Sequence, residues 1–492
     1  MIKVSKSLSR LPSMFHIYSL KFCVCVLGGI LILFSIPAFA GSELLALLGV
    51  LRDNGTITTK QYERLRREAV GGTTSAEERL EHPSEKIATM DHSDSSPVNA
   101  AVLQLEGQNV TSNKAVITTT KVDSRLKIET KGGLYVESAD GNFAFGLRGN
   151  IWLDAAVYNE DQSAFGNGSE LRRARAALEG RLFRDWGYAA EYEFSDNKAE
   201  VKDAYIEYNG LKSVKIKLGQ FKEPFSLEEQ TSGKNITFME RALPVEAFSP
   251  GRNLGLGIMG GGKRWSASAG LFGEGVGDKT PDNGDSGWGI AARTTYALVD
   301  RKKQLVHLGG SVEYRRPNDE NEVRYRTRPE SHVADRRLVD TRTIDEVADT
   351  YTFGLESAVI FGSLLLQGEY LEAHVNRDTN LPNLQFDGWY LNSSWLLTGE
   401  SRRYDGARGR FKHVKSKNPY GAWELALRYS DIDLSDKDIL GGKEQDVTLG
   451  LNWYVNPNVR FMVNYIWVNA DPDKNGENDE PGVFQIRTQL DF

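Results

Sequence analysis

The chain has 492 residues, a formal net charge of −7 and two cysteines. This length allows more than one domain, and the segments differ enough in composition to be taken separately. An acidic chain lacks the electrostatic footprint of a nucleic-acid-binding protein, so no nucleic-acid partner is expected. Two cysteines are too few for a disulfide scaffold.

The first 40 residues have the pattern of a cleaved secretory signal peptide. An apolar run from Phe22 to Ile36 is followed by small residues, with a cleavage site after Ala40. The run is about 15 residues long, shorter than the ~20 that an uncleaved membrane anchor needs. The segment also contains both cysteines and four basic residues, namely Lys3, Lys6, Arg10 and Lys21. We therefore expect an exported, thiol-free mature chain, whose formal net charge falls from −7 to −11 because four positive and no acidic residues are removed.

Residues 41–70 are predicted to form a short helical periplasmic segment. Leu44, Leu48 and Leu51 lie on one helical face, and Thr58 and Gln61 have the spacing of a capping box. The segment either joins or tethers subunits or is a helical tail without a partner, since so short an apolar face is marginal alone. Residues 71–128 are rich in Ser, Thr, Glu and Asn and are predicted to be a flexible linker.

From residue 129 to residue 492 the sequence alternates between apolar and polar residues, as strands with two different faces do. The final strand shows the alternation best. Its apolar register holds Phe484, Ile486, Thr488, Leu490 and Phe492, and the opposite face holds Gln485, Arg487, Gln489 and Asp491. The same division occurs in residues 143–154, 214–218, 423–429 and 446–453.

Three features favour a membrane barrel over a soluble sandwich, which would alternate as well. Aromatic residues such as Trp265 and Trp467 fall on apolar faces near strand ends, as in membrane-interface girdles. Short turns alternate with long polar loops, and the chain stops on Phe492 in the apolar register. The predicted fold is an all-β transmembrane barrel of about 16 antiparallel strands, a closed outer-membrane porin embedded in outer-membrane lipid.

Two segments of the predicted barrel are unusually long. Residues 222–252 follow the fifth strand, and in general porins the third extracellular loop in this place folds inward and narrows the channel. Gly399 to Pro419 is long and basic where a short periplasmic turn is expected. This second segment either extends the flanking strands or forms a periplasmic feature.

Strand register places a set of basic side chains on the lumenal face, and the third loop adds two more. These pore-lining, anion-binding candidates are Arg148, Arg173, Arg175, Lys215, Lys217, Arg293, Arg428 and Arg487 on strands and Lys234 and Arg241 in the loop. Guanidinium groups bind oxyanions through planar, charge-assisted hydrogen bonds, so this set would favour small, phosphate-like anions. The alternative is a solvated network of ion pairs with Glu179, Glu191 and Glu313, which would give little selectivity.

No motif for catalysis competes with a channel. The seven His residues are scattered, and neither a zinc-protease motif nor a nucleophile elbow is present. We therefore expect a protein without catalytic residues, metal or cofactor. A non-selective or structural barrel, and a barrel enzyme assembled from distant strands, remain the alternatives.

Leu218 to Phe225, continued by Ile236 to Arg241 and Pro250 to Arg252, resembles the phosphate-selective porin O and P family. Lys202 to Tyr205 and Gly421 to Ser430 are similar to other signatures of that family. The resemblance covers residues 131–492. It implies a barrel of this size, a homotrimer, and a pore in which an arginine ladder leads to a lysine-containing constriction.

Carried over by residue, Arg172 and Arg173 resemble an arginine pair of that ladder, and Lys234 resembles a lysine of the third loop. Strand register points Arg173 into the lumen and Arg172 outward or to the rim. Where phosphate-selective members have a further lysine early in this loop, the chain has Glu229 or Gln230. A Glu at the constriction would repel phosphate, so the resemblance does not establish phosphate as the solute.

Overall fold

The computed structural model describes residues 126–130, 132–278, 284–378, 380–472 and 477–492, together with positions 52, 59, 60, 62, 63 and 66. The predicted signal peptide lies outside the described residues, as do most of the predicted helical segment and linker. The chain divides into two units, Met1–Lys114 and Ala115–Phe492. In the first unit the described positions are helical, and the Arg52 guanidinium carbon lies 4.6 Å from the centre of the Tyr62 ring.

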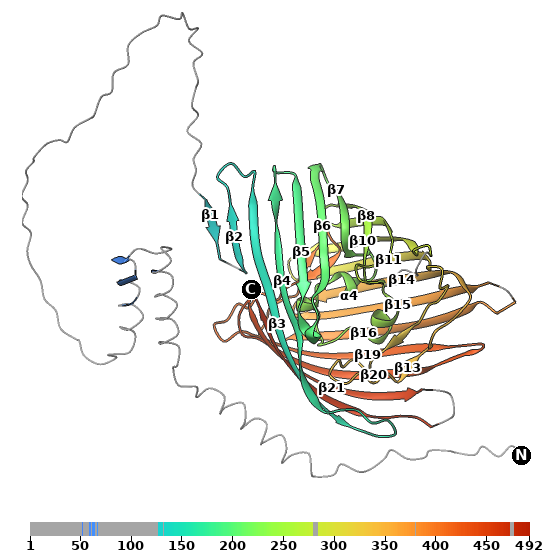
Figure 1. Ribbon diagram of the computed structural model, residues 1–492. Coiled ribbons are helices and arrows are strands. Elements are labelled where there is room, and N and C mark those ends of the chain that lie inside the picture. Colours follow the sequence, from blue (N-terminus) through green and yellow to red (C-terminus); the bar gives the residue numbers. More distant parts are fainter. Residues whose placement is uncertain are drawn as a thin grey trace, which may run out of the picture. The chain divides into compact units, whose positions relative to one another are not determined.

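In the second unit, 16 antiparallel strands formed by the described residues close into a barrel (Figure 1). This confirms the predicted fold class. The strands of the wall are β3 (Ala144–Asn159), β4 (Gly168–Leu182), β5 (Trp186–Glu193), β6 (Glu200–Leu211), β7 (Val214–Lys222), β8 (Arg252–Gly261), β9 (Trp265–Phe272), β10 (Trp288–Arg301), β11 (Gln304–Arg316), β14 (Val347–Phe361), β15 (Leu364–Arg377), β16 (Leu384–Leu396), β19 (Ala422–Asp436), β20 (Ile439–Tyr454), β21 (Val459–Asp471) and β22 (Gly482–Asp491).

The barrel closes where the last strand, β22, pairs with the first, β3, from Gly482 opposite Asn159 to Asp491 opposite Asn150. The terminal Phe492 continues the ladder, because its backbone exchanges hydrogen bonds of 2.9 and 2.7 Å with Gly149. Beyond this point β3 pairs with β2 (Leu134–Glu137), which pairs with β1 (Lys127–Glu129). The short hairpin of β1 and β2 therefore pairs with the part of β3 that lies beyond the end of β22. It begins just before residue 129, the predicted start of the barrel.

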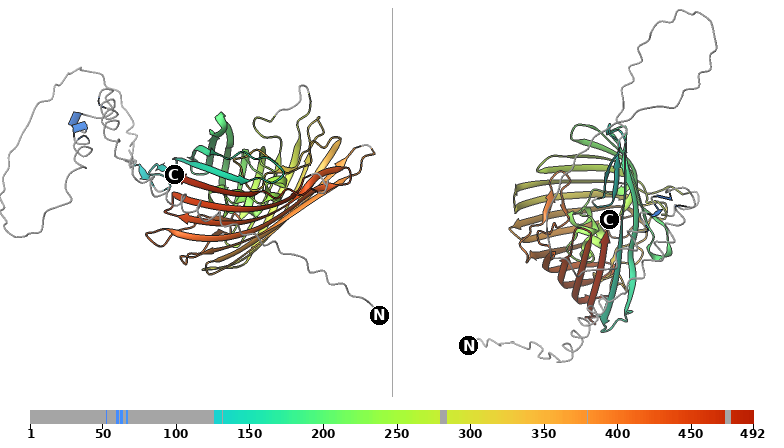
Figure 2. Two further views of the ribbon diagram at one scale, coloured as in Figure 1. Left: turned by 90° about the horizontal axis from the view of Figure 1, so that it is seen from below. Right: turned by 90° about the vertical axis from the view of Figure 1, so that its left-hand side faces the viewer.

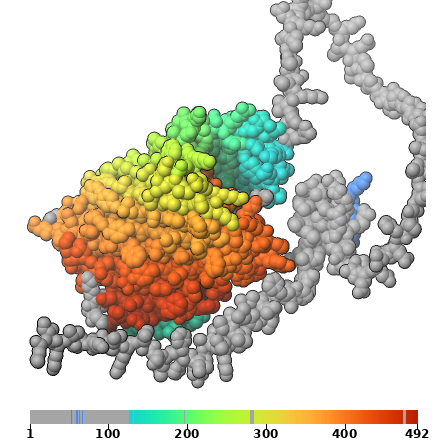
Figure 3. Space-filling view, turned by 180° about the vertical axis from the view of Figure 1, so that it is seen from behind, coloured from blue at the N-terminus to red at the C-terminus, as the bar shows by residue number. Residues whose placement is uncertain are grey.

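The two faces of the wall have opposite chemistry. Large apolar side chains such as Leu355 and Trp395 are exposed on the outside, whereas Arg428, Arg460 and Arg487 are buried inside. Exposed apolar side chains around a polar interior require lipid as the outer solvent. Figure 3 shows one outer face, made largely by the orange and red C-terminal half of the barrel. Among the described residues, no helix is long and apolar enough to cross a membrane.

Loop L3 (residues 223–251) folds into the lumen, as predicted for the segment after the fifth strand, and Figure 2 shows this green segment within the ring of strands. It contains α4 (Leu227–Gln230), the 3₁₀ turn η3 (Gly233–Asn235) and α5 (Leu243–Phe248). Leu243 and Phe248 join a buried cluster with Leu371 and Phe386 of the wall. Apolar packing therefore holds α5 against β15 and β16.

Gly399 to Pro419 extends neither flanking strand. Within residues 397–421, called here the basic hairpin, β17 (Arg403–Asp405) and β18 (Arg410–Lys412) form a separate two-stranded sheet. Its Phe411 is buried with Leu227 of α4 and Leu365 of β15. The segment therefore folds into the barrel and contacts loop L3, a place that neither of the two alternatives left open by the sequence described.

A third inward element is loop L5 (residues 317–346), with β12 (Arg326–Thr327) and β13 (Val339–Asp340). Its Glu330 accepts a hydrogen bond of 2.9 Å from Arg428 Nε on β19. A further 3₁₀ turn, η2 (Ser195–Asn197), lies between β5 and β6.

Candidate pore constriction

Loop L3 is irregular, so its backbone carbonyl groups need donors that are not its own. The barrel wall supplies them. Arg460 donates to the carbonyl groups of Ile236 and Thr237, at 2.8 Å each, and Asn452 donates to Thr237 at 2.9 Å. Arg428 donates to the carbonyl of Glu240 at 3.1 Å, and Arg487 donates to that of Met239. These wall side chains fix the loop.

Three of the candidate arginines are buried in ion pairs within the wall and its loops. Arg293 binds Glu356 at 2.9 and 2.6 Å, and Arg428 binds Glu330. Arg487 binds Asp154 at 2.7 and 2.6 Å. A buried carboxylate offsets each of these charges, and the geometry favours a structural role for all three.

Arg148, Arg175, Lys215 and Lys217 lie on the lumenal side of β3, β4 and β7, and each has a carboxylate nearby. Arg175 binds Glu193 at 2.7 Å and Glu191 at 3.1 Å. Arg148 binds Glu179 at 2.7 Å, and Lys215 and Lys217 share Glu207 at 3.0 and 3.5 Å. This part of the lumen is a network of pairs, as the alternative interpretation of the sequence expected.

Arg172 does not point outward or to the rim, and that expectation was wrong. The pairing of β3 with β4 shifts at Trp152 and Leu153, which lie opposite Arg173 and Leu171. Arg172 is the extra residue of this β-bulge, and a bulge redirects side chains that alternation would place on the other face. Both Nε and Nη2 of Arg172 donate to the Glu240 carboxylate of L3, at 2.9 and 2.8 Å.

Arg173 is held differently from the other lumenal arginines. Its guanidinium carbon lies 3.7 Å from the centre of the Trp152 ring. The closest carboxylate is Glu193, 3.8 Å from Nε, which is an ion-pair contact beyond hydrogen-bond range. Within the described residues, no acceptor takes a hydrogen bond from this guanidinium.

Lys234, in η3 of L3, is half-buried and has no ion-pair partner among the described residues. Its turn rests against the wall, because Gln489 of β22 donates to the Lys234 carbonyl at 3.3 Å. A Cβ added to Gly233 would lie 2.8 Å from Arg173 Nη1, so a larger residue at this position would displace the Arg173 guanidinium. The loop therefore brings the Lys234 turn beside Arg173.

Glu229 does not stand as an isolated negative charge in the constriction. Lys222 Nζ lies 2.7 Å from Oε1, and Arg241 Nε lies 2.7 Å from Oε2. Burial alone would raise the pKa of Glu229, but Arg241 and Lys222 outweigh it and hold the pKa below its usual value. Two basic side chains share this one carboxylate, so the expected repulsion of phosphate by Glu229 is offset locally.

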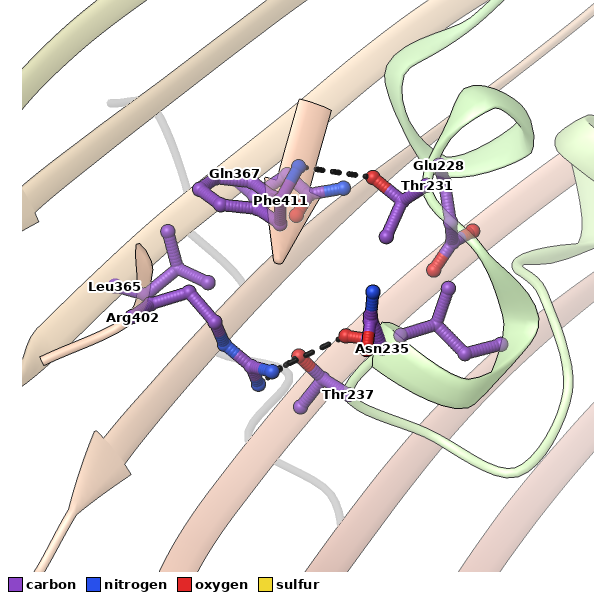
Figure 4. A pocket seen from close by; sticks show the side chains of 9 residues that line it. Glu228, Thr231, Asn235, Thr237, Leu365, Gln367, Arg402 and Phe411 are labelled. Atoms are coloured by element: carbon purple, nitrogen blue, oxygen red, sulfur yellow. Dashed lines mark hydrogen bonds between the residues drawn. The ribbon is translucent and has the colours of Figure 1, made fainter. Parts of the chain in front are cut away.

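Sequence reasoning missed the residues of the basic hairpin that face L3. Arg402 donates to Asn235 O at 3.1 Å and to Thr237 Oγ1 at 3.0 Å, and the Phe411 N–H donates to Thr231 Oγ1 at 3.3 Å (Figure 4). The cavity between the two elements is about 10 Å³, room for one water. The basic composition of residues 399–419 was the available signal, but turn position argued against a lumenal place.

His413 of the basic hairpin adds no charge at neutral pH. Burial, reinforced by the positive charges of Arg460 and Lys234, lowers its pKa to about 4. Among the described residues, no group of His, Asp or Glu has an arrangement suited to a metal ion.

A closed barrel with an apolar exterior, a charged lumen and an inward third loop defines a porin of the Gram-negative outer membrane. The family model described as "Phosphate-selective porin O and P" matches residues 145–492. The chain belongs to this family.

Two curated relatives are similar over most of the chain. Porin O of Pseudomonas aeruginosa is 28% identical over 416 residues, covering 76% of this chain and 94% of the relative. An uncharacterized protein of Caulobacter vibrioides is 31% identical over 390 residues, covering 74% and 77%.

The solved structures similar to this chain include a porin and an outer-membrane channel of other bacteria. The anion-selective porin from Comamonas acidovorans has 14% identity and a TM-score of 0.47, covering 71% of this chain and 98% of that one. The outer-membrane channel DcaP of Acinetobacter baumannii has 12% identity and a TM-score of 0.46, covering 72% and 99%.

Proposed function

We propose that the protein is a passive channel for small anions, and that Lys234 and Arg173 set its preference at the constriction. The observation that carries this proposal is the contrast between these two side chains and their neighbours. Arg293, Arg428 and Arg487 are bound by carboxylates, whereas Lys234 has no ion pair and Arg173 donates no hydrogen bond within the described residues. Within the described residues, no carboxylate hydrogen-bonded to either side chain offsets its positive charge, which can therefore act on a solute.

Position gives these two charges more weight than their number. At the constriction an ion is partly dehydrated and the surroundings are less polarisable, so each charge acts several times more strongly than in a wide, watery vestibule. A guanidinium and an ammonium next to each other suit an oxyanion, which accepts several charge-assisted hydrogen bonds. Inorganic phosphate is one such solute, and the family description supports testing it first.

The remaining parts of the proposal concern biogenesis and assembly. The chain is exported, cleaved after Ala40, and assembled as a homotrimer, with residues 41–70 as a helical periplasmic segment and residues 71–128 as a linker. Family membership supports the trimer. The protein acts as a channel and not as an enzyme, which the inward loop and the family both favour.

Planar bilayers test the channel and its preference together. Purified protein should give stepwise conductance, and its reversal potential in a potassium chloride gradient should have the sign for anions. Lys234→Gln should move the reversal potential toward cations. Lys212→Gln, in the exposed turn between β6 and β7, is the matched control and should leave it unchanged.

Three results would contradict the proposal. The first is a barrel without conductance steps, which would favour a structural role. The second is a wild-type protein that prefers cations. The third is equal effects of Lys234→Gln and Lys212→Gln, which would move the selective point away from L3.

A further inference from the structure

Trp152 lies on the lumenal face of β3, almost fully buried, between two guanidinium groups. The guanidinium carbon of Arg173 is 3.7 Å from the centre of the ring, and that of Arg487 is 4.8 Å away. The indole N–H points to Asp491, with 3.4 Å between Nε1 and Oδ1. The ring is therefore fixed at its edge and contacts both cations with its π surface.

The two arginines differ in what else holds them. Arg487 is bound by Asp154 and Glu240, so the ring is a minor part of its surroundings. Among the described residues, Arg173 contacts the ring and forms an ion-pair contact of 3.8 Å with Glu193. The ring face is thus the closest partner that orients the Arg173 guanidinium.

An aromatic ring and a carboxylate position a cation with different consequences. A carboxylate neutralises the charge and takes up hydrogen-bond donors. A ring attracts the cation through its quadrupole, without carrying a net charge and without accepting the in-plane N–H groups. An arginine held on a ring face therefore keeps its charge and its donors.

We propose that Trp152 is a specificity-determining positioning residue, which presents Arg173 to the anion beside Lys234 without neutralising it. This inference rests on the proposed function. The place of L3 agrees with it, because a Cβ at Gly233 would lie 3.1 Å from Trp152 Cη2 and 2.8 Å from Arg173 Nη1. The turn that carries Lys234 thus rests on the same ring and guanidinium.

Trp152→Leu removes the π surface and keeps an apolar side chain. The half-blocking concentration of inorganic phosphate for chloride current should rise roughly threefold or more, because a cation–π contact contributes that much even at exposed sites and more when it is buried. The reversal potential should move toward cations. Trp152→Phe keeps a weaker ring and should give a smaller change in the same direction, which also serves if the Leu variant fails to assemble.

The Arg173→Gln background separates positioning from general damage. If Trp152 acts through Arg173, then Trp152→Leu and Trp152→Phe should change neither the half-blocking phosphate concentration nor the reversal potential further in that background. The matched control is Trp453→Leu, because Trp453 stacks on Trp423 with 5.3 Å between ring centres on the outer face. It should leave phosphate block unchanged.

Two results would overturn the inference. One is unchanged phosphate block in Trp152→Leu and Trp152→Phe, and the other is an equal effect with and without Arg173. The proposed function fails separately, if the wild-type channel prefers cations. Even then, the role of Trp152 would be supported if Trp152→Leu moves the reversal potential further toward cations and does not do so in the Arg173→Gln background.

Discussion

Arg172 of β4 and Glu240 of loop L3 form a two-pronged ion pair, with Nε and Nη2 donating to separate carboxylate oxygens at 2.9 and 2.8 Å. Arg487 of β22 donates to the same carboxylate at 2.6 Å. One loop residue thus joins strands on both sides of β3. Burial opposes ionisation, but Arg172 and Arg487 hold the pKa of Glu240 well below its usual range.

Glu240→Gln should loosen L3, because it leaves the partly buried Arg172 guanidinium without its carboxylate and removes one of the two carboxylates that bind Arg487. Loss of one partner from a buried pair costs roughly 3–5 kcal/mol, and the partial exposure here places the effect at the lower end. We expect heat-modifiable migration on gels to convert at a lower temperature, and channel current to become noisier. Arg336→Gln is the control, because this side chain of loop L5 donates to Ser163 and not to Glu240.

The same pair predicts how acid affects the loop. A carboxyl group whose pKa is lower in the folded protein stabilises it fully above the unfolded pKa, about 4.5 for Glu, and loses this contribution as pH falls through the folded pKa. Channel noise in the wild type should therefore rise only below pH 4.5. Glu240→Gln should be noisy at neutral pH and change less on acidification; a wild type that becomes noisy between pH 7 and 5 would contradict this.

Much of the wall was predictable from sequence, because a strand with lipid on one side must alternate. The final strand shows this, with Ile486 and Leu490 exposed outside and Arg487 buried inside. Arg172 escaped the rule because one extra residue in β4 changes the register locally, and no feature of residues 168–182 alone marks the bulge. Alternation predicts whether a side chain faces lipid or lumen, but it does not predict which residue it meets across the lumen.

The candidate site was less predictable, because the partners of a guanidinium group depend on which residues the fold brings near it, not on their separation in sequence. Arg487 meets Asp154, 333 residues away, and Arg428 meets Glu330, 98 residues away. Strand register placed both arginines on the lumenal side, as the structure does. Only the folded barrel shows that their N–H groups donate to carboxylates and to L3 carbonyl groups. Lys234 differs because its short turn ends beside Arg173, and no carboxylate in the described part of the chain forms an ion pair with it.

Glu229→Gln should strengthen anion preference, although Glu229 is already neutralised by Lys222 and Arg241. Removing the carboxylate releases both cations, each 2.7 Å from it, and raises the local net charge by one. The half-blocking phosphate concentration should fall several-fold, because charges near the constriction act in a poorly screened region. Gln230→Glu adds a carboxylate at the neighbouring position and should raise the half-blocking phosphate concentration. Unchanged phosphate block in both variants would place these residues outside the ion path.

Anion conductance should depend on pH near neutrality through Glu223. This residue lies at the start of L3 beside Arg315 and Glu313. Both line a cavity of about 350 Å³, together with residues of L3, of loop L5 and with Glu274, Asp278 and Gly287. Burial, reinforced by Glu313 and opposed by Arg315, raises the pKa of Glu223 to about 7. Below that pH the carboxyl is neutral and the group gains one positive charge, so anion preference should rise from pH 8 to pH 6. Glu223→Gln should remove this dependence, and a pH dependence that survives the substitution would assign it to another group.

Closure of the barrel should fail when Gly149 is enlarged. The Gly149 backbone binds Phe492 in both directions, and an added Cβ would lie 2.6 Å from the Arg175 carbonyl oxygen and 2.7 Å from the Phe492 ring. Backbone at the Arg175 contact cannot move without opening the β3–β4 ladder, so Gly149→Val should displace the terminal residue and break the last pairing of β22 with β3. We expect most of the protein to lack heat-modifiable migration and to accumulate outside the outer membrane. Gly166→Val is the control, because nothing lies within 4 Å of an added Cβ there. Normal assembly of Gly149→Val would show that the contact of Phe492 with Gly149 is dispensable for closure.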